Sequence, residues 1–129
     1  MLSQARLEAL VALARRHGWR LVVLFGSSVH CAGRDVVLAV LLAQLPDGMQ
    51  LGSWQAAHDA LFAPRPVDRV LIHAGMSPRL RFAALCRGRC LYEAEAGLFD
   101  AEQDRAFFLH ADSAPLRRAL AEYLREATA

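Results

Sequence analysis

The stretch VVLFGSSVHCAGRDVVLAVLL, residues Val22–Leu42, decides the fold of this chain. Two apolar runs, Leu21–Phe25 and Val36–Leu42, each have the length and the β-branched content of a buried strand. The connection between them contains Gly26, Ser27, Gly33 and Asp35. A strand that ends in Gly-Ser leaves backbone N–H groups unpaired, which suits a phosphate, and an aspartate at the start of the next strand could hold a metal ion beside it.

Length and composition favour one compact unit. With 129 residues, 55% of them hydrophobic and 22% charged, the chain is long enough for one core and too short for two ordinary domains. We therefore expect a single domain over residues 1–129, with a core over 19–93 and C-terminal helices over 96–127.

Charge and hydropathy exclude several classes of protein. The net charge is +2, and all 15 basic residues are arginines that form no dense run, which argues against a direct nucleic-acid partner. The apolar runs are well short of the roughly 20 residues needed to span a bilayer, and no signal peptide opens the chain. With three cysteines and no export signal, we expect reduced thiols and a cytoplasmic protein.

Apolar periodicity predicts an α/β (α+β) fold in which helices flank a small mixed sheet. We expect strands over 19–25, 35–42, 67–73 and 89–93, the last of them at a sheet edge. We expect helices over 2–16, 53–62 and 77–86. The segments 98–109 and 115–127 have helical periodicity and form either one long bent helix or two. Ser3 and Gly18 are placed to cap and to end the first helix.

The sequence around Gly26 resembles a known family. The run Leu24-Phe25-Gly26-Ser27, followed by Asp35 and the strand after it, is similar to the Gly-Ser…Asp-x-Asp signature of nucleotidyltransferases related to DNA polymerase β. The likeness is greatest to the minimal nucleotidyltransferases (MNT proteins), which serve as antitoxins beside HEPN-domain toxins. The segments 67–72, 77–81 and 87–93 extend it over most of the chain. The resemblance implies a polymerase β-like fold with a C-terminal helical segment.

The resemblance also implies a chemistry and a set of site residues. Nucleotidyl transfer needs two magnesium ions held by shared carboxylates, and alternate residues of a strand aim an Asp-x-Asp pair at one site. Asp35 matches the first carboxylate and Asp68 the third, as catalytic residues and metal ligands. Gly26 and Ser27 match the part that binds the nucleotide phosphates. The position of the second carboxylate is occupied by Val37.

Two departures from the family pattern predict a degenerate site. Val37 offers no oxygen to a hard cation, and the loss of a bridging carboxylate removes a ligand from both metals at once. The connection between Ser27 and Asp35 is also shorter than in the resembled family, and Val29-His30 replaces its usual basic residue. We therefore expect a protein that binds a partner rather than a working enzyme, with no cofactor.

Three functions stay open. The first is an MNT-type antitoxin, or a protein derived from one, that neutralises a helical HEPN-type ribonuclease by contact. The second is an active nucleotidyltransferase that moves AMP from ATP to a protein hydroxyl, with magnesium on Asp35, Asp68 and a carboxylate not assigned. Asp47 and Glu93 are too far from the motif in sequence to be assigned that role. The third is a domain that binds nucleotide without turnover.

Several of these residues also fit purely structural roles. Gly26-Ser27 is typical of any strand-to-helix turn, and Asp35 and Asp68 of solvated residues at strand ends. Cys86 and Cys90 lack the second pair that a zinc site needs, so we interpret them as packing residues. The four arginines between 79 and 89 are typical of a solvated helix face. The C-terminal segment is rich in large apolar residues, and the surplus favours an oligomer or partner interface.

Overall fold

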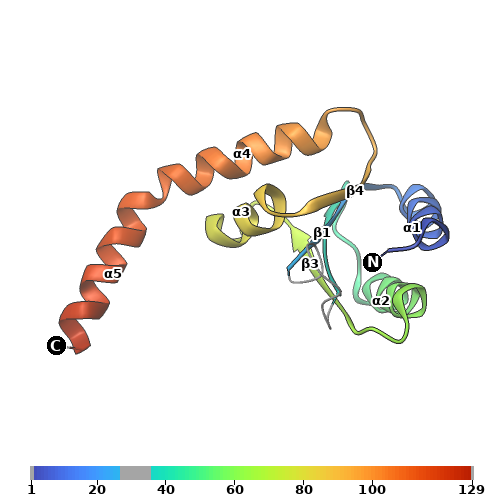
Figure 1. The fold of residues 1–129 in the computed structure, drawn as a ribbon, viewed down its shortest axis with the longest axis horizontal. Helices are drawn as coiled ribbons and strands as arrows, with labels where there is room; N and C mark the ends of the chain where they lie inside the picture. The colour runs from blue at the N-terminus through green and yellow to red at the C-terminus, as the bar shows by residue number, and fades with distance from the viewer. Residues whose placement is uncertain (1, 27–35, 129) are drawn as a thin grey trace.

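The computed structural model describes residues 2–26 and 36–128, so Ser27 and Asp35 lie outside the described residues. The elements follow in the order α1 (Gln4–His17), β1 (Trp19–Phe25), β2 (Val36–Leu42), α2 (Gly48–Phe62), β3 (Val67–Ile72), α3 (Pro78–Cys86), β4 (Arg89–Glu93), α4 (Leu98–Asp112) and α5 (Ala114–Thr128) (Figure 1). The prediction of an α/β fold with a small flanked sheet is confirmed.

The four described strands form one mixed sheet in the order β3-β2-β1-β4. β1 is antiparallel to both β2 and β4, whereas β2 and β3 run parallel. β4 lies at an edge, as predicted. The antiparallel register pairs Phe25 with Val37, and the parallel register pairs Val37 with Asp68. The two apolar runs of the opening stretch therefore lie side by side at the centre of the sheet.

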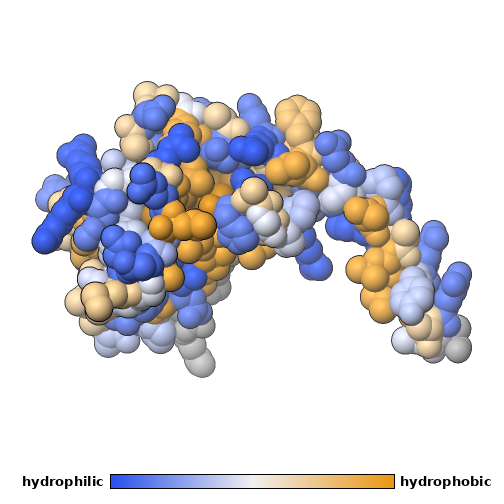
Figure 2. Space-filling view, turned by 180° about the vertical axis from the view of Figure 1, so that it is seen from behind, coloured by the Kyte–Doolittle hydropathy of each residue, from blue (hydrophilic) through white to orange (hydrophobic). Residues whose placement is uncertain are grey.

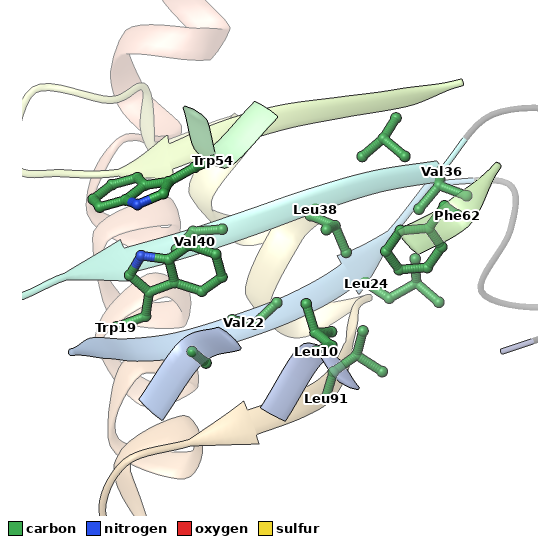
Figure 3. Packing of buried hydrophobic residues seen from close by; sticks show 12 residues of the cluster. Leu10, Trp19, Val22, Leu24, Val36, Leu38, Val40, Trp54, Phe62 and Leu91 are labelled. Atoms are coloured by element: carbon green, nitrogen blue, oxygen red, sulfur yellow. The ribbon is translucent and has the colours of Figure 1, made fainter. Parts of the chain in front are cut away.

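Helices α1 and α2 cover one face of the sheet (Figure 1). Alternate residues of a strand point to the same face, and Leu38 and its same-face neighbours pack here beneath Leu10 of α1 and Phe62 of α2 (Figure 3). Trp19 and Trp54 meet edge to face, with ring centroids 5.4 Å apart. These two rings fill the end of the core farthest from Gly26.

Helices α3 and α4 cover the opposite face. Leu21 and Ala39 of the central strands pack there against Leu85 of α3 and Ala106 of α4, all four fully buried. α4 belongs to the core through its first half, where Leu98 and Ala106 are buried.

Local capping explains where the helices begin. Ser3 caps α1 and Gly18, with φ +67°, ends it, as predicted. The predicted start of α2 at residue 53 is wrong, because the helix begins at Gly48. Asp47 and Gln50 form a capping box: the Asp47 side chain accepts from the Gln50 amide at 2.8 Å, and the Gln50 side chain accepts from the Asp47 amide at 3.1 Å. The Pro-Asp-Gly sequence of residues 46–48 is typical of a turn, and it hides this box in the sequence.

The chain ends in two helices rather than one. α4 stops at Asp112 and α5 starts at Ala114, and α5 extends away from the sheet (Figure 1). No residue of α5 is buried. We call residues 107–128 the C-terminal arm. Among the helices of the described residues, none is both long and apolar enough to cross a membrane.

Candidate functional site

The predicted site falls at the end of the sheet where β1 stops and β2 and β3 begin. Gly26 follows β1 with φ +88°, a left-handed backbone conformation that favours glycine. A Cβ atom on Gly26 would lie 3.5 Å from a Val37 methyl group, so the turn passes directly over that side chain. We call this region, defined by Gly26, Val37 and Asp68, the Gly26 end of the sheet.

Val37 and Asp68 lie next to each other on one face of the sheet. They are register partners on the parallel strands β2 and β3. Val70 and Ile72 pack into the cluster below α3 and α4, and strand alternation places Asp68 on their side. Val37 shares this face with Ala39 by the same rule. The sequence-based expectation that positions 37 and 68 converge therefore holds, while Asp35 and Ser27 lie outside the described residues.

Among the described residues, the Gly26 end offers one carboxylate, that of Asp68. Val37 is half-buried and carries only methyl groups, and Asp68 is exposed. Within residues 2–26 and 36–128, no group of three or more His, Cys, Asp or Glu side chains could hold a metal ion. The roles proposed for Gly26, Asp35 and Asp68 stay predictions.

The two carboxylates that sequence alone left unassigned are used elsewhere. Asp47 follows the far end of β2 and caps α2. Glu93 pairs with Leu21, at the opposite end of β1 from Gly26, and its Oε1 accepts from the Phe99 amide at 3.1 Å. Neither carboxylate reaches the Gly26 end of the sheet.

The described cysteines behave as packing residues, as predicted. Cys86 ends α3, and its Sγ donates to the Gln103 carbonyl oxygen at 3.5 Å. Burial raises the pKa of the Cys86 thiol, and burial raises the pKa of the Cys90 thiol to about 11. Both thiols pack against the cluster between the sheet and α3–α4. Neither is activated for nucleophilic chemistry.

One of the four arginines departs from the predicted solvated face. Arg81 is buried, and its Nη2 donates to the His73 carbonyl oxygen at 2.5 Å. Its Nη1 lies 3.5 Å from a Glu102 carboxylate oxygen. Arg81 therefore joins the end of β3, α3 and α4. Arg79, Arg87 and Arg89 are exposed.

Sequence reasoning missed a buried histidine on the face of the sheet that α1 and α2 cover. His58 of α2 is fully buried, and its ring centroid lies 5.1 Å from that of Trp19. Neither ring nitrogen has a hydrogen-bond partner among the described residues. Burial, followed by the charge of Arg69, lowers the pKa of His58 to about 4. The spacing of Trp54, His58 and Phe62 on one helix face was the available signal. A hollow of about 200 Å³ opens beside Trp54, far from the Gly26 end.

Comparison with known proteins defines the fold. No family model and no curated protein matches the sequence. One chain of the crystal structure of the MntA–HepT toxin–antitoxin superposes with a TM-score of 0.74 at 20% identity, covering 95% of this chain and 99% of that chain. A chain of the structure of the tri-AMPylated Shewanella oneidensis HEPN toxin in complex with MNT antitoxin gives a TM-score of 0.74 at 21% identity, with 95% and 98% covered.

A further crystal structure from Shewanella oneidensis has the same TM-score at 15% identity, and covers 95% of this chain and 98% of that chain. The chain therefore has a nucleotidyltransferase fold. The likeness to these structures extends over almost the whole length of the chain.

Proposed function

We propose that this chain is an MNT-type antitoxin that binds a HEPN-type toxin and acts by contact, without a cofactor. The likeness to MNT–HEPN structures supports the class of protein and the class of partner. The superpositions cover nearly all of this chain and of the chains compared with it, which supports the same arrangement of helices and strands. The low identity leaves the chemistry to be argued from the residues.

Position 37 carries the proposal that the transfer site is degenerate. The MNT pattern requires a carboxylate at this position. Val37 is instead the register partner of Asp68. One of its methyl groups would lie 3.5 Å from a Cβ atom placed on Gly26. A hard cation at this point would lose an oxygen ligand and gain an apolar neighbour. Magnesium-assisted transfer, which depends on both metals, has no support at this position.

The alternative is an active enzyme that transfers AMP from ATP to a hydroxyl of its partner. One of the similar structures contains a tri-AMPylated toxin, which favours this chemistry for that protein. Here the site would need magnesium, Asp35, Asp68 and a further carboxylate. Asp47 and Glu93 cannot be that carboxylate because they lie at the opposite end of the sheet. Nucleotide binding without turnover needs fewer ligands and is the weaker third candidate.

Co-expression tests the proposed partner. The chain is produced with the HEPN-type protein of an adjacent reading frame, and co-purification in a stable complex and loss of the ribonuclease activity are measured together. We expect both. A chain that purifies alone and leaves the ribonuclease active would contradict the proposal.

A labelling experiment separates binding from transfer. The purified complex is incubated with ATP labelled at the α-phosphate and with magnesium. We expect no label on the HEPN-type protein. Transfer of label that disappears in the variant Asp68→Asn would establish the active enzyme instead.

A further inference from the structure

One side of α5 carries an uncovered apolar stripe. Its members follow the spacing i, i+4, i+7 and i+8, which places them on one side of a helix. They are Leu116, Leu120, Tyr123 and Leu124, and between 53 and 74% of each is exposed. We call these four residues the α5 stripe. Figure 2 shows apolar side chains on the side of α5 that is turned towards the sheet domain, and charged side chains on its outer side.

The direction of α5 is fixed by contacts at the junction with α4. Arg117 donates from Nη1 to the His110 carbonyl oxygen at 2.6 Å and also contacts the Ser113 hydroxyl. The His110 ring stacks on Phe82 of α3 with centroids 4.3 Å apart. These contacts connect α5 to α3 through α4. The stripe faces the open space between α5 and the sheet domain, which we call the hollow (Figure 2).

The junction beside this hollow is strongly cationic. Arg117 bonds the His110 carbonyl oxygen, and Arg87 Cζ lies 5.6 Å from the centroid of the Phe82 ring on which His110 stacks. Desolvation lowers the pKa of His110, and the charges of Arg117, Arg87 and Arg79 lower that pKa further. Arg79 and Arg87 are exposed, and α3 contains no acidic residue. The hollow therefore combines an apolar wall on α5 with a positive rim on α3 and at the junction.

We propose that this hollow binds an acidic amphipathic helix of the partner protein. This inference depends on the proposed function. The apolar side of the bound helix packs on the α5 stripe, and its carboxylates face Arg79, Arg87 and Arg117. An acidic helix fits because opposite charges are complementary across an interface, whereas a basic helix would meet three guanidinium groups.

A second copy of this chain fits the hollow less well. α5 itself carries three arginines and two glutamates, so α5 of a second copy would bring one net positive charge to a positive rim. The structural likeness to chains of toxin–antitoxin complexes covers 95% of this chain, so it includes most of the arm. A heterologous partner helix is therefore the occupant that charge and comparison both favour.

Designed peptides test the chemistry of the hollow directly. The probe is a fluorescent helical peptide of about 18 residues with leucines at a and d positions and glutamates elsewhere, and its twin has lysine for every glutamate. Binding to the full chain is measured by fluorescence anisotropy. We expect the acidic peptide to bind at least about tenfold more tightly than its twin, with a difference that shrinks as salt is added. Equal affinity, or no binding of either peptide, would overturn the proposal.

Variants locate the binding surface. The double variant Leu120→Glu/Leu124→Glu is expected to weaken binding of the acidic peptide at least about tenfold, since both positions lie on the stripe. Its control with the same change in charge is Ala121→Glu/Arg125→Gln, away from the stripe on α5, with a smaller effect. Arg79→Glu/Arg87→Glu should reverse the preference between the two peptides. Circular dichroism checks that helix content is kept. Unchanged binding in the stripe variant, or an arm-dependent dimer in sedimentation, would overturn the proposal.

The same variants distinguish this inference from the proposed function. If the HEPN complex forms and the stripe variant leaves it intact, the hollow is not the docking site, while the function stands. If the peptides discriminate as expected but no HEPN complex forms, the surface stands and the proposed function fails.

Discussion

The Gly26 end of the sheet and the C-terminal arm differ in what they can still do. At the Gly26 end, Val37 places methyl groups beside Gly26 and in register with Asp68, where the resembled family has a carboxylate. On the arm, four large apolar side chains of α5 are exposed within the described part of the chain. We propose that the chain uses the arm for binding and carries out no transfer at the Gly26 end.

The two regions also differ in how they contribute to stability. Core residues of the central strands, such as Leu21, Leu38 and Ala39, are fully buried beneath helices, so substitutions there remove packing. Residues of the arm bury little, so substitutions there should change partner binding and leave folding nearly unchanged. The predictions below test this difference, beginning with the largest effect.

Gly88 should be the least tolerant position. A Cβ atom there would lie 2.0 Å from the Ala84 carbonyl oxygen and 2.5 Å from a Val23 methyl group. We expect Gly88→Ala to lower the free energy of unfolding by about 4 kcal/mol or more, measured by chemical denaturation. The control is Gly97→Ala at the start of α4, where a Cβ meets nothing within 4 Å and only the φ of +87° opposes it, at about 1 kcal/mol. Equal losses would contradict the close packing around Gly88.

His58 should make stability depend on pH. Its pKa is about 4 in the folded protein and about 6.5 in the unfolded chain, so the unfolded chain binds the proton more readily between these values. Stability should fall as pH drops from about 6.5 to about 4, by roughly 3 kcal/mol in total. His58→Leu should remove this part of the dependence. Unfolding curves across this range that are unchanged by the substitution would contradict the assignment.

Arg81 should hold α4 against α3 and the end of β3. Arg81→Leu removes the hydrogen bond to the His73 carbonyl oxygen and the ion pair with Glu102. We expect a loss of about 2 kcal/mol in the free energy of unfolding, because the Glu102 carboxylate loses its ion pair and the His73 carbonyl oxygen keeps only the bond from the Met76 amide. Arg79→Leu, on the exposed side of the same helix, should change stability by less than about 0.5 kcal/mol. Similar losses in both variants would argue against the role of Arg81.

The smallest effect is expected in the arm. Leu120→Ala/Leu124→Ala should change the free energy of unfolding by no more than about 0.5 kcal/mol, because both side chains are more than half exposed. Leu38→Ala in the sheet should cost about 2–5 kcal/mol. A large loss in the arm variant would show that the arm stabilises the folded chain and would weaken the contrast between the two regions.

Most of the fold could be predicted because its signals are local. The two apolar runs fixed β1 and β2, Ser3 and Gly18 marked the ends of α1, and Ser77-Pro78 marked the start of α3. The start of α2 was missed because Asp47 and Gln50 cap each other across residues that read as a turn. Whether the C-terminal segment bends or breaks depends on Arg117 and Ser113 contacts that periodicity does not reveal.

The site was only partly predictable for a related reason. Strand alternation and the family pattern brought Val37 and Asp68 to one place, and their register confirms that. Burial of Arg81 and His58 depends on which helix covers which face, which a single sequence does not state. Arg81 bonds a backbone carbonyl oxygen, and a sequence does not show such a partner. The sequence alone therefore predicts a solvated side chain.

Thermal unfolding of Val37→Asp with and without magnesium tests the central claim most directly. The new carboxylate would face Asp68 across the strands, so the two charges should repel each other and magnesium should relieve the repulsion. We predict that magnesium raises the unfolding temperature of Val37→Asp and leaves the wild type and the uncharged control Val37→Asn unchanged. An equal response in the wild type, or none in Val37→Asp, would contradict the account of a transfer site that lacks one oxygen.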